Sequence, residues 1–111
     1  MQFDVQKPQP GRLLVRLEGV LDRNAVPSIR KKLLSAIRKN VSEGGVVSLD
    51  LSRAPEMDTA GVALLVEALE SVSGCHSKLR LTGLSEKAGR LIRLTRLEQV
   101  FGLKDASQSP E

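Results

Sequence analysis

The chain of 111 residues has few aromatic side chains, almost no cysteine and no long apolar runs. Phe3 and Phe101 are its two aromatic residues, and it has neither Trp nor Tyr. Modules that bind single-stranded nucleic acid usually stack bases on aromatic side chains set between basic ones, so we do not expect nucleic-acid binding. The single cysteine, Cys75, cannot form a disulfide within the chain.

No apolar run approaches the roughly 20 residues that a membrane-spanning helix needs. The first five residues also lack the basic start and apolar stretch of a signal peptide. We therefore expect no membrane insertion and a cytoplasmic location, which the lone cysteine supports weakly. The net charge of +4 allows an acidic partner but does not require one.

Residues that could support catalysis or hold a metal are also scarce. A zinc or iron site needs three or four ligands, and Cys75 and His76 have no other Cys or His to join them. Neighbouring residues rarely converge as a Cys–His nucleophilic pair, and no Gly-x-Ser-x-Gly elbow or Gly-rich phosphate loop is present. We therefore expect a non-enzymatic protein without metal or cofactor. A hydrolase built on Cys75 or His76 is the competing hypothesis.

The chain does contain a regular alternation of strand and helix patterns. Strands are predicted over residues 2–6, around Leu13, Val15 and Leu17, over 46–51, and around 79–82. Helices are predicted from an N-cap at Asn24 to the Gly44-Gly45 break, from Thr59 to Val72 with Gly74 as C-cap, and from Ser85 to about Arg96. The apolar residues predicted to face inward from the second helix are Val62, Leu65, Val66, Leu69 and Val72.

This order predicts a single α/β domain over residues 1–103, with right-handed crossovers between its strands. Its mixed sheet should have four to five strands, with three to four helices packed on it. Leu97, Val100, Phe101 and Leu103 supply a last short helix or strand, and residues 104–111 are predicted to be a flexible tail.

The clearest functional signal is the turn Asp58-Thr59-Ala60-Gly61, which follows a buried strand and starts a helix. The turn places the Thr59 hydroxyl at a helix N-terminus, where backbone N–H groups are free and the dipole favours negative charge. A hydroxyl in that position suits reversible phosphorylation. An ordinary helix cap at Asp58 explains the same residues when they are taken alone.

Three stretches together make the chain resemble a STAS domain (sulfate transporter and anti-sigma-factor antagonist). The first is Leu17-Glu18-Gly19-Val20-Leu21-Asp22, and the second is Leu49-Asp50-Leu51-Ser52 followed by the Asp58-Thr59-Ala60-Gly61 turn. The third runs from Leu81-Thr82-Gly83-Leu84 through Leu91 to Phe101. They cover about residues 12–102 in the order that the family shows.

The resemblance implies an anti-sigma-factor antagonist whose phosphoacceptor is Thr59. Its protein partner would be a cognate anti-sigma kinase, bound through the phosphoacceptor turn and Asp22. The expected partner-binding residues are Asp22, Asp58, Thr59, Ala60, Gly61 and Val62. The alternative is a STAS subunit or segment of a bacterial phospholipid-transport ABC complex, which binds its ATPase subunit through the Thr59 helix.

Two further features have both a functional and a plain interpretation. Asp22 could contact the partner or could simply be a turn residue that leads into the first helix. Lys87, Arg90, Arg93 and Arg96 form a basic ridge at a spacing of three residues. Such a ridge could meet acidic lipids or an acidic partner, but it is more often a solvated helix face.

Overall fold

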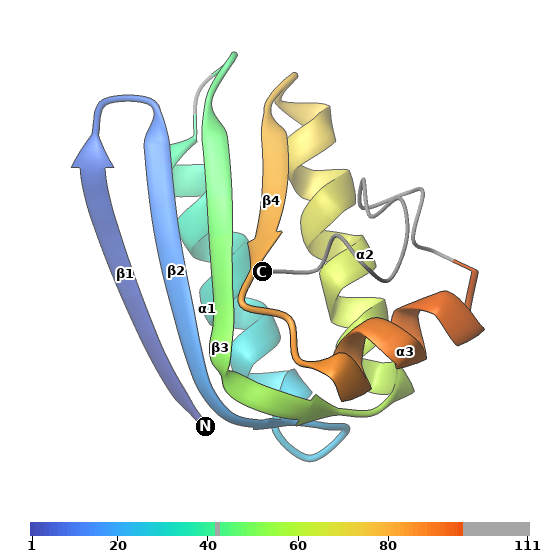
Figure 1. Ribbon diagram of the computed structural model, residues 1–111. Helices are drawn as coiled ribbons and strands as arrows, with labels where there is room; N and C mark the ends of the chain where they lie inside the picture. The colour runs from blue at the N-terminus through green and yellow to red at the C-terminus, as the bar shows by residue number, and fades with distance from the viewer. Residues whose placement is uncertain (42, 97–111) are drawn as a thin grey trace.

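The computed structural model describes residues 1–41 and 43–96 (Figure 1). Its elements in chain order are β1 (Gln2–Gln9), β2 (Arg12–Leu21), α1 (Val26–Asn40), β3 (Val46–Met57), α2 (Thr59–Gly74), β4 (Lys78–Thr82) and α3 (Glu86–Leu94). The predicted α/β fold is confirmed. The last short element predicted at 97–103 and the tail predicted at 104–111 lie outside the described residues, so both stay predictions.

The described strands form one mixed sheet in the order β1-β2-β3-β4. β1 and β2 are an antiparallel pair, whereas β2–β3 and β3–β4 are parallel pairs. Helix α1 connects β2 to β3, and α2 connects β3 to β4. Because β2 and β3 are parallel neighbours, the turns that follow them emerge at the same end of the sheet (Figure 1).

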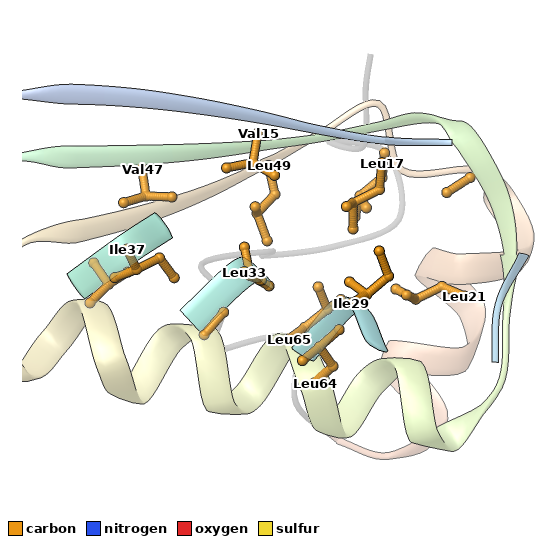
Figure 2. Close-up of a cluster of buried hydrophobic side chains, with 14 of the residues drawn as sticks. Val15, Leu17, Leu21, Ile29, Leu33, Ile37, Val47, Leu49, Leu64 and Leu65 are labelled. Carbon is orange, nitrogen blue, oxygen red and sulfur yellow. The ribbon is translucent and has the colours of Figure 1, made fainter. Parts of the chain in front are cut away.

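The core lies between one face of the sheet and the helices α1 and α2. Alternate residues of β2 and β3 are buried there, as a strand with one face on the core requires. Figure 2 shows these side chains opposite the apolar residues of the two helices. The residues buried in this cluster include Val15, Leu17, Leu21, Ile29, Leu33, Ile37, Val47, Leu49, Leu64 and Leu65.

Two strands extend beyond their predicted limits. β1 continues through Pro8 to Gln9, which an edge strand tolerates because a proline there breaks no central ladder. β3 runs past the predicted end at Leu51 to Met57, whereas β2 ends at Leu21, just before the predicted end at Asp22. The added residues of β3 pair with the last residues of β2 across two register shifts, so this extension depends on tertiary pairing.

The helix ends also differ in detail from the prediction. The predicted N-cap at Asn24 is wrong, because α1 starts at Val26 and the Asp22 carboxylate accepts hydrogen bonds from the N–H groups of Asn24 and Ala25. Gly74 is the last residue of α2 instead of its cap, and Cys75 takes the C-cap position.

The N-caps predicted for the other two helices are confirmed, at Asp58 for α2 and Ser85 for α3. The inward face of α2 is only partly as predicted. Leu64 and Ala68 are fully buried although they were not assigned to it, whereas Val66 and Leu69 are half-buried.

Candidate functional site at the ends of strands β2 and β3

The predicted phosphoacceptor turn and the predicted Asp22 turn lie side by side. The last residues of the two parallel strands, Leu21 and Met57, are paired, so Asp22 and Asp58 follow at adjacent positions. The N–H of Asp58 donates to the carbonyl oxygen of Leu21 at 3.2 Å. The fold therefore brings together two segments that are 35 residues apart in the chain.

Asp58 caps α2 with one carboxylate oxygen and bonds the neighbouring turn with the other. Its Oδ1 accepts from the N–H groups of Ala60 at 2.9 Å and Gly61 at 3.2 Å. Its Oδ2 accepts from the N–H of Arg23 at 3.0 Å. Burial raises the pKa of Asp58 and is the largest single influence, but the N–H donors together outweigh it and hold the pKa below its usual value.

Thr59 is the first residue of α2, and it is exposed. Among the hydrogen bonds between described residues, none involves its hydroxyl, so the oxygen is open to solvent and to an approaching protein. No acidic residue lies within the first turn of α2, which leaves the positive end of the helix dipole without a counter-charge beyond the cap. This geometry can accept a phosphate without breaking the helix.

Gly61 and Val62 lie at the back of the turn and are buried. A Cβ at Gly61 would come 2.5 Å from the carbonyl oxygen of Leu21, so the backbone that this glycine admits belongs to the chain's own strand β2. The Val62 side chain is only 3% exposed and belongs to the core. Contact of these two residues with a partner stays a prediction. In the structure, Gly61 allows the close approach of β2 and Val62 packs in the core.

Asp22 is half-buried and holds its own turn together. Its carboxylate accepts from Asn24 and Ala25 N–H groups, both at 3.0 Å, as the turn interpretation predicts. Sequence reasoning missed Arg23, whose backbone N–H reaches Asp58. The position of Arg23 next to Asp22 was the only indication of its role in the sequence. The hydrogen bond from Arg23 to Asp58 joins distant segments, so no local sequence pattern predicts it.

The other residues considered from the sequence lie elsewhere. On α3, Lys87 pairs with Glu56 at 3.5 Å, and both side chains are largely exposed. Cys75 and His76 follow the C-terminal end of α2, away from the turn that precedes its first residue.

Across residues 1–41 and 43–96, no three His, Cys, Asp or Glu side chains gather as a metal site would require. Within the same ranges, no helix is both long and apolar enough to cross a membrane.

A family model described as "Mlab, STAS domain" matches residues 6–104. The chain belongs to the STAS-domain family. The match covers nearly all of the predicted domain, and the resemblance seen in the three sequence stretches is thereby confirmed.

One curated relative of this STAS domain is the anti-sigma-B factor antagonist of Listeria monocytogenes. The two are 26% identical over 105 residues, which is 95% of this chain and 90% of the relative. Relatives with the same description occur in Staphylococcus epidermidis, at 26% identity over 94 residues that cover 85% of this chain and 84% of theirs. These relatives are described as antagonists of an anti-sigma-B factor.

Solved structures of three other proteins share the fold. An anti-sigma factor antagonist from Mycobacterium paratuberculosis has a TM-score of 0.72 at 19% identity, covering 97% of this chain and 92% of its own. The Bacillus protein SpoIIAA in its phosphorylated form has a TM-score of 0.65 at 24% identity, covering 92% and 85%. A sulfate transporter family protein from Wolinella succinogenes has a TM-score of 0.68 at 19% identity, covering 87% and 76%.

Proposed function

We propose that this STAS-domain protein is an anti-sigma-factor antagonist that binds a cognate anti-sigma kinase and is released by phosphorylation of Thr59. The observation that carries the proposal is the exposed Thr59 hydroxyl on the first residue of α2, directly after the capping Asp58. The protein acts by binding and performs no catalysis of its own. Its curated relatives, which are named as anti-sigma-B factor antagonists, support this class of function.

A phosphate on Thr59 would act at the surface and would leave the fold intact. It adds about −1.5 to −2 charges at neutral pH. The N-terminal end of α2 attracts that charge, whereas the ionised Asp58 beside it repels it. The net effect on the fold is therefore small, and the new charge and bulk stand where a partner would dock on Thr59, Ala60 and Asp22.

The test is affinity purification of the wild-type protein, Thr59→Glu and Thr59→Ala from the native cell, with mass spectrometry of partners and of Thr59. We expect a kinase to co-purify with the wild type and with Thr59→Ala, and to be lost with Thr59→Glu. Phosphate should be found on wild-type Thr59. A kinase that stays bound to Thr59→Glu would contradict the proposal.

Ser73→Glu is the matched control for the added charge. Ser73 is exposed on the same helix, 14 residues along from Thr59, and thus about 21 Å away at 1.5 Å per residue. Binding should survive this substitution. Loss of the kinase with both glutamate variants would point to a general charge effect and would count against Thr59 as the switch.

The second candidate is a STAS subunit or segment of a phospholipid-transport ABC complex. The favouring observation is that the matching family model carries the name Mlab and not that of an antagonist. The same purification separates the two: an ATPase or permease that co-purifies with the wild-type protein, with no phosphate on Thr59, would establish the transport alternative and make Thr59 a docking residue.

A further inference from the structure

We propose that Asp58 is a positioning residue whose carboxylate fastens the β2–α1 turn to the first turn of α2 and so holds Asp22 and Thr59 in one surface. That this surface is the docking site rests on the proposed function. The fastening itself is a property of the free protein, and it can be tested without any partner.

The two carboxylate oxygens of Asp58 serve two different segments. Oδ1 takes the two N–H groups at the start of α2, at 2.9 and 3.2 Å. Oδ2 takes the N–H of Arg23, at 3.0 Å. Each oxygen is therefore used, and the side chain connects the segments as well as capping the helix.

Among the described residues, one hydrogen bond joins the β2–α1 turn to the α2 turn, and it runs from the Arg23 N–H to Oδ2 of Asp58. The other hydrogen bonds of this turn stay inside it or run into α1: the Asp22 carboxylate takes Asn24 and Ala25, and its carbonyl takes Ala25 and Val26. The Leu21 carbonyl meets Asp58 N–H one residue before the turn begins. Without Oδ2, the turn would keep its internal shape and its connection to β2, but it would lose its direct hydrogen bond to the α2 turn.

Helix capping alone does not require an aspartate at this position. Ser, Asn and Asp cap helices about equally well, because each offers one oxygen to the first N–H groups. Aspartate is the one among them with two acceptor oxygens on a short side chain. The geometry uses the second oxygen for Arg23, so this chain gains a contact from Asp58 that a serine cap cannot supply.

The test compares Asp58→Ser with Asp58→Ala by backbone amide hydrogen exchange in the full chain. Asp58→Ser should keep exchange at Ala60 and Gly61 within about twofold of wild type, because the hydroxyl still caps α2. Exchange at Arg23 should rise by about tenfold to a hundredfold, as expected for loss of a hydrogen bond to a charged group. Asp58→Ala, which removes both functions, should raise exchange at all three.

The wild-type protein offers a second measurement that needs no substitution. As the pH falls, the amide proton shifts of Arg23, Ala60 and Gly61 should move with one common midpoint, because all three bond the same carboxylate.

Two results would overturn the proposal. One is unchanged exchange at Arg23 in Asp58→Ser, and the other is a midpoint for the Arg23 amide shift that differs from that of Ala60. Both readouts come from the free protein, so they are independent of the kinase experiment. Unchanged exchange at Arg23 would refute the fastening by Asp58 without bearing on the Thr59 switch. Failure to find a kinase would count against the switch without bearing on the fastening.

Discussion

Adding one methyl group at Gly61 should destabilise the protein, and the size of the effect follows from what the new Cβ would meet. It would come 2.5 Å from the carbonyl oxygen of Leu21 and 3.0 Å from Cβ of Met57. The nearest atom is backbone, and the Asp58 N–H is hydrogen-bonded to it at 3.2 Å, so it cannot turn away as a side chain could. Helix α2 must therefore shift away from the end of β2.

Two opposing effects set the magnitude for Gly61→Ala. Alanine is favoured over glycine inside a helix by about 1 kcal/mol. Overpacking in a tight site costs about 1–3 kcal/mol, and we place this clash at the upper end because strand backbone is involved. The expected net loss is about 2 kcal/mol of unfolding free energy. In a domain of this size it lowers the melting temperature by about 10 °C.

Urea and thermal unfolding of the purified variants provide the assay, with Gly74→Ala as the matched control. Gly74 is in the same helix, and a Cβ there would meet nothing within 4 Å. That substitution should stabilise the protein by about 0.4–1 kcal/mol, because it restricts the unfolded chain without a clash. If Gly61→Ala proves as stable as Gly74→Ala, the close approach of α2 to Leu21 is not what demands glycine at residue 61.

Two further predictions concern the core and the response to acid. Leu65→Ala should lose about 2–5 kcal/mol of unfolding free energy in urea titrations, since Leu65 is fully buried, whereas Leu94→Ala, 75% exposed, should change little. Hydrogen bonds from Ser52 lower the pKa of Asp50, and those from Arg30 lower the pKa of Glu67. The folded-state pKa values of these two carboxyl groups lie below their unfolded-state values. The stability that the ionised carboxylates contribute is therefore complete above about pH 4.5 and is lost as the pH falls through the folded-state pKa. Equal unfolding free energies at pH 3 and pH 7 would contradict this account.

Local sequence patterns predicted most of the elements, because the apolar spacing of each segment reflects which face it buries. The alternation around Val15 and the helical spacing of Ile29, Leu33 and Ile37 match the observed core. The second half of β3 could not be predicted in this way. Its residues past Leu51 are mostly exposed and contain Pro55, and they are a strand because they pair with the far end of β2.

The candidate site shows the same division between local and long-range information. Asp58 as the cap of α2 and Thr59 as an exposed residue follow from the turn alone. The bond from Arg23 to Asp58 spans 35 residues and depends on the parallel pairing of β2 with β3, which the turn sequence does not record. For the same reason, the close neighbour of Gly61 could not be identified as Leu21 before the fold was known.

The parallel pairing of β2 and β3 fixes where this surface lies, whereas the turn residues that follow the two strands determine its chemistry. The two strands end in register at Leu21 and Met57, so whatever residues follow them are presented together. Loops tolerate sequence change far better than the strands that carry them. Under the proposed function, partner choice could therefore diverge among duplicated copies, or be redesigned, through exposed positions such as Arg23 and Asn24 while the buried strands stay as they are.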